Sequence, residues 1–475
     1  MLLLFAAMGA AIYFLSTLTV LYDIDRAGYR AIFACSSTFI SGRSLEQIEA
    51  FELTESAFDL PIRVSKTFPI AIDREMRTAS VPFDPSRPPV RAGFREGIGC
   101  SLLPYGAPKS AVAKLPRLSK ARPASDKGND HWHDRGPLQA IPIEPDYADA
   151  LASVVNGAFE RDAYGEGVRT VGVVVIHRDH VVKEQYRDGF GPRIQYRTWS
   201  TAKSLTNAVI GVAIKDGVLP GVDSPALIPH WQTPADSRRT ISLENLLHMA
   251  SGLRTYYNEE SGSRSFAAYW MGVDSAADAA SLESLHPAGS VWHYSNYDTL
   301  LLLLSLKTAL GDDQAYLDFP YERLFDRIGM HDTFAETDSA GNYLMSSQVY
   351  TTARDLARFG YLYLQDGIWG SERILPEGWV DYSCTATTAK GDKRSVMYGA
   401  QWWLADIQFD ASAGLKDLRL CYTSGARGQH MAFVPEHDLV IVRTGIDNML
   451  GDGFSERQFF QDVIRAVAGN TSIAR

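Results

Sequence analysis

The segments with β-strand character in this chain form two groups, with a long stretch of predicted helices between them. The first group is a pair of apolar runs, Thr170 to His177 and Val181 to Tyr186, whose spacing predicts a β-hairpin. The second group lies near the C-terminus and comprises Leu418 to Tyr422, His430 to Val434 and Leu439 to Thr444. Strands at both ends of a region imply one antiparallel sheet closed by its first and last segments, with an all-helical insertion. The sequence therefore predicts an α+β fold.

Apolar periodicity near 3.6 residues predicts the helices of this fold. They are Asp146 to Phe159, Ser200 to Gly217, Ile241 to Gly252, Thr299 to Ala309, Thr352 to Leu364 and Glu456 to Val467. At 475 residues, 45% hydrophobic and 21% charged, the chain is long enough for one large domain or two smaller ones. Its net charge of -10 includes no basic stripe, which argues against nucleic acid as a partner.

Ser200 and Lys203 form an S-x-x-K pattern at the start of one predicted helix. Residues three apart lie on one helix face, so the Lys203 amine should lie beside the Ser200 hydroxyl. The partial positive charge of a helix N-terminus favours an alkoxide and an oxyanion, and a desolvated lysine can accept the serine proton. Because one such pattern is expected by chance in a chain of this composition, the tetrapeptide alone is weak evidence for catalysis.

A second motif, Tyr294-Ser295-Asn296, directly precedes the helix predicted from Thr299. A phenol can relay a proton, and an amide can hold a substrate carbonyl or the lysine amine. A lone Tyr-x-Asn is weak evidence, whereas the same triplet downstream of Ser200 and Lys203, followed by a Gly-rich turn into paired strands, favours nucleophilic catalysis.

In these motifs the sequence resembles the serine β-lactamase and penicillin-binding-protein superfamily over about residues 145 to 470. It is most similar to class C-like esterases, D-aminopeptidases and 6-aminohexanoate oligomer hydrolases, through Leu246 to Leu253, Gly329-Met330, Gly425 to Gln429 and Phe433 to Glu436. The resemblance implies a β-lactamase/transpeptidase-like fold, in which an antiparallel sheet is flanked by helices with an all-helical subdomain. It also implies a covalent acyl-serine, with no metal and no cofactor.

The resemblance assigns roles to individual residues. Ser200 would be the nucleophile, Lys203 its base, Tyr294 the relay that protonates the leaving group and Asn296 a positioning group. The backbone N-H groups of Ser200 and Ala426 would form the oxyanion hole, if Thr423-Ser424-Gly425 is the third motif.

The third motif departs from the family pattern, because Thr423 stands where relatives have Lys or His. Arg427, four residues later, could reach the space of the missing cation, so Gly425, Ala426 and Arg427 are candidate substrate-binding residues. Three histidines near the motifs are interpreted as packing or hydrogen-bonding residues rather than general bases: His248, His293 and His430.

The function expected from these motifs is a serine hydrolase that cleaves an amide or ester of a small molecule. One alternative within the same fold is a penicillin-binding D,D-peptidase or a β-lactamase. Another is a non-catalytic acyl-binding sensor module, in which acylation occurs without turnover.

The N-terminus predicts a membrane anchor. Leu2 to Tyr22 contains no charged residue and is long enough to cross a bilayer as a helix, with the catalytic domain outside the cytoplasm, in the periplasm. A cleaved secretion signal is the alternative. The domain boundaries expected are 1–24 for the anchor or signal, 25–103 for an N-terminal extension, 104–145 for a Pro-rich linker and 146–475 for the hydrolase.

Four cysteines are compatible with disulfides in an exported chain. Sequence cannot choose among the three pairings, although the positions favour two local pairs, Cys35 with Cys100 and Cys384 with Cys421. Four free thiols are the alternative. In the linker, His131-Trp132-His133-Asp134 is interpreted as solvated chain rather than a metal site.

Overall fold

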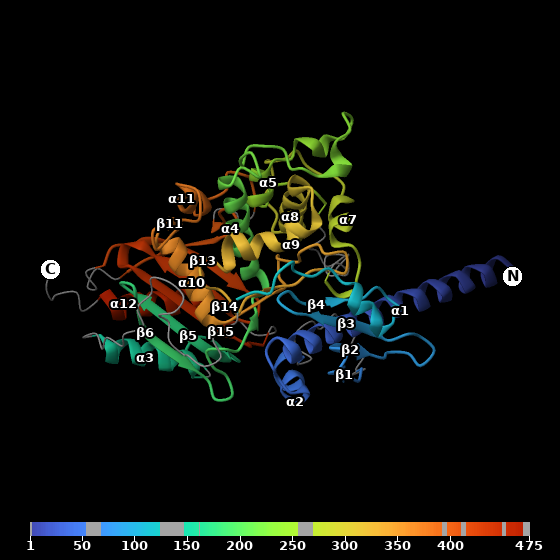
Figure 1. The fold of residues 1–475 in the computed structure, drawn as a ribbon, viewed down its shortest axis with the longest axis horizontal. Coiled ribbons are helices and arrows are strands. Elements are labelled where there is room, and N and C mark those ends of the chain that lie inside the picture. The colour runs from blue at the N-terminus through green and yellow to red at the C-terminus, as the bar shows by residue number, and fades with distance from the viewer. Residues whose placement is uncertain are drawn as a thin grey trace.

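The computed structural model describes most of the chain, with side chains from residue 19 onward. The described residues are 2–53, 68–123, 147–160, 162–254, 269–391, 397–409, 415–448 and 453–468. Figure 1 shows a six-stranded sheet with its helices, a helical part above it and an N-terminal extension, defined here as residues 2–123, at the opposite side from the C-terminus.

The six-stranded sheet is antiparallel throughout, in the order β12-β13-β14-β15-β5-β6. Its strands are β5 (Thr170–His177), β6 (His180–Tyr186), β12 (Trp403–Ile407), β13 (Leu418–Gly425), β14 (Gln429–Val434) and β15 (Leu439–Gly445). Val442 of β15 lies opposite Val174 of β5, so the two strand groups of the sequence meet inside one sheet. The predicted closure of the sheet is confirmed.

Both faces of this sheet are covered, and the side chains of β5 show how. Val173 and Val175 point into a core shared with α3 (Ala148–Phe159) and α12 (Glu456–Ala468). Val174 and Ile176 point the opposite way, into the larger core that contains α10 (Ala353–Leu364). A strand buried on both faces needs apolar residues at every position, which explains the continuous apolar run in the sequence.

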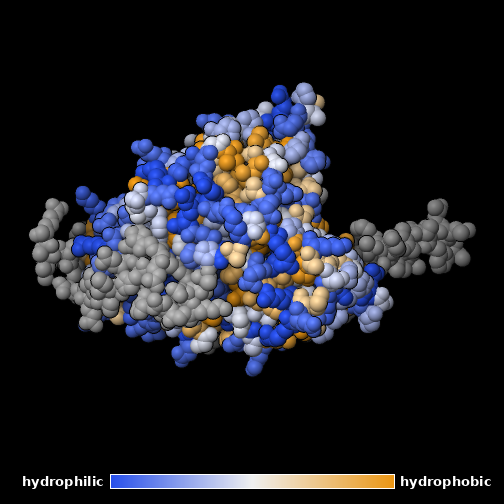
Figure 2. Space-filling model, in the orientation of Figure 1, coloured by the Kyte–Doolittle hydropathy of each residue, from blue (hydrophilic) through white to orange (hydrophobic). Residues whose placement is uncertain are grey.

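The helical part surrounds α4 (Ala202–Lys215), in which every residue from Ala202 to Ala213 is buried. Its other elements include α5 (Leu243–Leu247), α7 (Ser275–Ala280), α8 (Asn296–Leu310), α9 (Asp313–Pro320), the π-helical turn η8 (Tyr321–Phe325) and α11 (Trp379–Ser383). On the face drawn in Figure 2, hydrophobic residues gather over the helical part and again toward the N-terminal extension, among hydrophilic residues. A small sheet of order β7-β9-β8 connects this part to the chain before Ser200 through β7 (Tyr196–Arg197), β9 (Val349–Thr351) and β8 (Phe334–Ala335).

The N-terminal extension is a folded unit that the sequence did not reveal. The long helix α1 (Leu2–Phe39) packs its C-terminal half on a four-stranded antiparallel sheet, and its other end projects from the body (Figure 1). The strands are β1 (Ala71–Asp73), β2 (Thr78–Val81), β3 (Val90–Arg95) and β4 (Gly99–Leu102). In the chain between α1 and β1 lie α2 (Leu45–Gln47) and the π-helical turn η1 (Ile48–Glu52).

Two disulfides are present, Cys35 with Cys100 and Cys384 with Cys421. The favoured local pairing is therefore confirmed. The first bond ties α1 to β4 inside the extension, and the second ties the end of α11 to β13.

Two other expectations concern residues whose side chains, or whose whole placement, the structure does not describe. Most of the predicted anchor, Leu2 to Tyr22, lies in the first 18 residues, whose side chains are not described. Across the described part of the chain, no helix has both the length and the apolar character needed to span a bilayer. Of the predicted linker, 104–145, residues 124–145 lie outside the described residues, including the segment His131 to Asp134. The earlier residues form η3 (Lys109–Lys114), which packs on β3.

One continuous apolar core joins the extension to the helical part. It contains Phe33 and Phe94 of the extension together with Trp199, Leu205 and Leu301. Because the two parts share this core, the extension lies against the chain segment that carries Ser200.

Candidate active site

Ser200 lies in a single 3-10 turn, η5 (Trp199–Thr201), immediately before α4. The residue before it, Trp199, has a φ of +50°, which is rare for a non-glycine residue. Thr201 donates through Oγ1 to the carbonyl of Gln429 at 2.8 Å and to Thr423 Oγ1 at 3.2 Å. These bonds fasten the turn to β13 and β14, and they leave Ser200 partly exposed between two buried neighbours.

The Lys203 amine has three described partners. Its Nζ lies 3.3 Å from Ser200 Oγ, 2.6 Å from Asn296 Oδ1 and 2.9 Å from the carbonyl of Ser346. No carboxylate is among these partners, and burial lowers the pKa of Lys203 to about 7. Burial disfavours the charged ammonium, so a large fraction of the amine is neutral near pH 7 and able to accept the Ser200 proton.

Tyr294 and Asn296 reach this amine from the start of α8. Ser295 caps the helix by accepting from the backbone N-H of Tyr297 and Asp298, which fixes the path of the chain at Asn296. The Lys203 Nζ lies 4.9 Å from the centroid of the Tyr294 ring. The four residues of the first two motifs therefore meet at one place, as the sequence predicts.

Several residues beside this amine have little or no signal in the sequence. Tyr294 is stacked on Trp403 at 5.3 Å between ring centroids and contacts Tyr398 edge-on at 5.7 Å. Trp403 begins β12 and Tyr398 lies shortly before it, and two aromatic residues in such positions are only a weak sequence signal for a site. The Ser346 carbonyl could not be predicted as a partner of Lys203, because every residue has a backbone carbonyl.

The third motif forms the end of β13. Thr423 is 1% exposed, and its Oγ1 accepts from the backbone N-H of Met431 at 3.1 Å as well as from Thr201. Gly425 lies so close to the turn that contains Ser200 that a Cβ there would be 2.1 Å from the carbonyl of Thr198. Only glycine permits this approach. Ala426 follows directly, partly buried.

The Arg427 guanidinium has protein partners instead of open space. It donates to the carbonyls of Phe51 at 2.5 Å, Glu52 at 3.0 Å, Asp447 at 3.1 Å and Ile446 at 3.4 Å. The side chain is buried and turned toward the extension and the chain after β15. Substrate binding by Arg427 stays a prediction, and this geometry does not favour it.

Two of the nearby histidines lie in packed surroundings. His248 Nδ1 is 3.1 Å from Glu244 Oε1, and its ring contacts Tyr382 edge-on. His430 is stacked on Phe454, and burial lowers its pKa. Neither has a described bond to Ser200 or Lys203.

The fold combines an antiparallel sheet with a helical part, and a serine and a desolvated lysine lie at the start of a helix between these two parts. These features define the class of β-lactamase-type serine hydrolases. The family model described as Beta-lactamase matches residues 155–444. The chain belongs to this family, and it is a serine hydrolase.

Similar proteins agree with this assignment. The 6-aminohexanoate-dimer hydrolase of Paenarthrobacter ureafaciens is 26% identical over 330 residues, which are 64% of this chain and 79% of that protein. A Bacillus anthracis structure, proposed to be a 6-aminohexanoate-dimer hydrolase, is similar with a TM-score of 0.52 and 22% identity, over 63% of this chain and 79% of that one. A Bacteroides dorei structure, proposed to be a β-lactamase, has a TM-score of 0.52 and 17% identity, over 68% and 99%. At such identities the two structures show the fold alone.

Proposed function

We propose that the enzyme cleaves an amide or ester bond through a covalent acyl-serine at Ser200. The observation that carries this proposal is the buried Lys203 amine, 3.3 Å from Ser200 Oγ, with a pKa lowered to about 7. A serine hydroxyl needs an adjacent base to become a nucleophile, and a lysine serves as that base only when burial makes it neutral.

The proposed reaction has two stages. Ser200 Oγ attacks the carbonyl carbon while its proton passes to the Lys203 amine, and the backbone N-H groups of Ser200 and Ala426 stabilise the oxyanion. The bond to the leaving group then breaks as Tyr294 relays that proton to the departing nitrogen or oxygen, with Asn296 positioning the amine and the substrate. Water attacks the acyl-serine in the same way, releasing the acid and restoring Ser200.

The substrate class proposed is an uncharged short-acyl ester or a linear amide. Thr423 carries no charge where relatives place a cation, and the Arg427 guanidinium is bound to backbone carbonyls. A charge-assisted bond to a substrate carboxylate, worth about 1.5 to 3 kcal/mol, would therefore be missing. The similarity to a protein named as a 6-aminohexanoate-dimer hydrolase supports a linear amide.

Labelling with a fluorophosphonate, followed by turnover assays, tests the proposal. We expect the native enzyme to be labelled, to hydrolyse a p-nitrophenyl ester with turnover, and to process a chromogenic cephalosporin more slowly. Acylation without turnover would favour the sensor alternative. Faster cephalosporin turnover, lost selectively in Arg427→Ala, would favour the D,D-peptidase or β-lactamase alternative and restore Arg427 as a substrate ligand.

We also propose that the catalytic domain works outside the cytoplasm, anchored through Leu2 to Tyr22. The two disulfides support an oxidising compartment, because cytosolic thiols are kept reduced. Membrane fractionation of the full chain and of a chain beginning at Asp23 tests the anchor. Recovery of unprocessed full-length protein in the soluble fraction would contradict it.

A further inference from the structure

The N-terminal extension contacts the catalytic part directly beside both proposed oxyanion-hole donors. One contact involves Trp199, the residue before Ser200. The other involves Arg427, the residue after Ala426. Both residues have positive φ, +50° and +60° respectively. A non-glycine residue in this region costs roughly 1 to 2 kcal/mol, so it persists only where its surroundings hold it there.

The first contact is a stack of side chains under Trp199. The Arg197 guanidinium lies 4.2 Å from the Trp199 ring centroid and 4.8 Å from that of Phe33, on α1. The Phe33 and Trp199 rings are themselves 5.7 Å apart. Arg197 also donates to the carbonyl of Ser347 at 3.2 Å and to its Oγ at 2.7 Å. These contacts oppose rotation of Trp199 out of its strained conformation.

The second contact fastens the turn between β13 and β14. Arg427 donates to the last carbonyls of η1, those of Phe51 and Glu52. Those carbonyls lie at the negative end of a helical turn, where a guanidinium is favoured. The planar guanidinium of an arginine can donate to several carbonyls at once, which the ammonium of a lysine would do less well.

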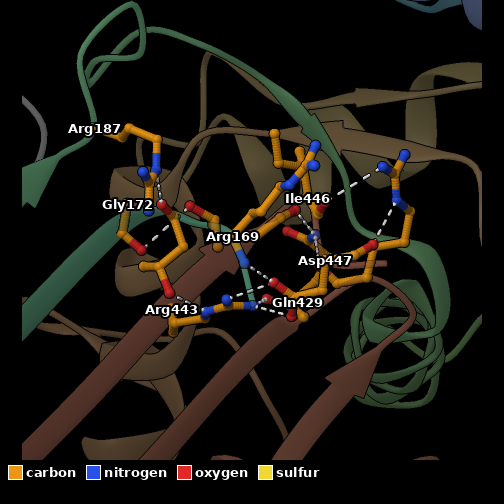
Figure 3. Close-up of polar contacts among 12 residues, drawn as sticks. Arg169, Gly172, Arg187, Gln429, Arg443, Ile446 and Asp447 are labelled. Carbon is orange, nitrogen blue, oxygen red and sulfur yellow. Dashed lines mark hydrogen bonds and ion pairs between the residues drawn. The ribbon is translucent and has the colours of Figure 1, made fainter. Parts of the chain in front are cut away.

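The remainder of the same turn is fixed by a buried network, drawn in Figure 3. Arg443 forms two bonds to Asp447, of 2.6 and 2.7 Å, and donates to the carbonyl of Gly428 at 2.9 Å. Gln429 donates to the carbonyl of Gly445 at 2.5 Å. Arg427 of the same turn donates to the extension, through the carbonyls of Phe51 and Glu52, so the turn is bonded both to this network and to η1.

The two contacts lie next to each other. A cavity of about 10 Å³ is lined by Glu52, Arg197, Trp199 and Arg427, together with residues of the neighbouring strands. Such a volume is about enough for a single water molecule. The extension, the nucleophile's turn and the β13–β14 turn therefore meet around one nearly filled space.

We infer that the N-terminal extension positions both backbone donors of the oxyanion hole, with Phe33 and Arg427 as positioning residues. This inference rests on the proposed function, because it assumes that the N-H groups of Ser200 and Ala426 stabilise the oxyanion. Oxyanion donors act in the transition state, so loosening either contact should lower kcat while leaving KM nearly unchanged.

The test uses Phe33→Leu and Arg427→Met in the full chain, with Arg427→Lys as a milder variant. The control is Arg122→Met. Arg122 also joins the extension to the catalytic part, through Asp326 and the carbonyls of Met330 and Thr333, and has no described contact with Trp199 or the β13–β14 turn. For each protein, the kcat and KM for a p-nitrophenyl ester, the rate of fluorophosphonate labelling and the melting temperature are measured.

We expect kcat and the labelling rate to fall roughly ten- to hundredfold in Phe33→Leu and Arg427→Met, with KM changed less than about threefold. The kcat and labelling rate of Arg427→Lys should lie between those of Arg427→Met and those of the native enzyme. Arg122→Met should keep native kinetics even if its melting temperature drops. Native kinetics in folded Phe33→Leu and Arg427→Met would overturn the inference. So would kinetic losses in Arg122→Met that match those of the other variants at the same drop in melting temperature. Failure of the native enzyme to be labelled would instead overturn the proposed function.

Discussion

Replacement of Asn296 by aspartate should change the charge state of Lys203 with almost no change in shape. Asn296 Oδ1 accepts from the Lys203 amine at 2.6 Å, and no carboxylate is among the described partners of that amine. In Asn296→Asp, a carboxylate would occupy this position. An opposite charge at such short range favours the ammonium and raises the lysine pKa by about 1 to 3.

The size of the effect follows from the native pKa of Lys203, about 7. At pH 7 about half of the native amines are neutral. If the carboxylate raises the pKa to about 9, only about 1% remain neutral, and kcat/KM at pH 7 falls roughly fiftyfold. At pH 10 about 90% of the Asn296→Asp amines and nearly all native amines are neutral, so protonation alone should leave kcat/KM within about twofold of native.

The assay is the pH dependence of kcat/KM for a p-nitrophenyl ester, which reports the pKa of the essential base in the free enzyme. The native profile should rise with pH through about 7, and that of Asn296→Asp through about 9. Asn296→Ala is the matched control, because it removes the amide without adding charge. An equal loss at every pH in Asn296→Asp would refute the reasoning and assign the amide to substrate positioning alone.

Three further substitutions test the remaining residues. Ser200→Ala should abolish turnover and fluorophosphonate labelling and change the free energy of unfolding by no more than about 1 kcal/mol, as calorimetry or denaturant titration would show. Tyr294→Phe should lower kcat by roughly a hundredfold, because it removes the relay hydroxyl and keeps the ring stacked on Trp403; an unchanged kcat would exclude the relay. Lys203→Met should be inactive, and the native protein should gain stability relative to it as the pH rises from about 7 toward 10, by up to about 1.4 kcal/mol per pH unit. In that window the unfolded lysine keeps a proton that the buried one has lost, so a pH-independent difference would contradict the lowered pKa of Lys203.

The sequence predicted those features that depend on local periodicity and spacing. The helix after Ser200 and the hairpin at Thr170 follow from residues close in sequence. The meeting of Lys203 with Asn296, which are 93 residues apart, was expected only from the resemblance of the two motifs to a known family. The predicted strand after Leu418 was too short, because β13 continues to Gly425, where polar Thr423 and Ser424 hid the pattern.

The N-terminal extension could not be predicted in the same way. Its strands are only three to six residues long, and they gain their stability from α1 and from the Cys35–Cys100 bond rather than from a strong pattern of their own. The partners of Arg427 were equally hidden. They are backbone carbonyls of Phe51 and Glu52, more than 370 residues earlier in the chain, and carbonyls carry no sequence signature.

The pairing of β5 with β15 also determines how late during protein synthesis the surroundings of Ser200 are completed. Gly172 and Thr444 are hydrogen-bonded neighbours although 272 residues separate them. A chain emerging from the ribosome N-terminus first presents Ser200 and Lys203 long before β14 and β15 exist. Until they arrive, β5 has an unpaired edge, and the Gln429 carbonyl that fastens Thr201 is missing. An incomplete chain therefore contains Ser200 and Lys203 before the strand that fastens their turn has been made, so the geometry of the candidate site is complete only when synthesis is nearly finished.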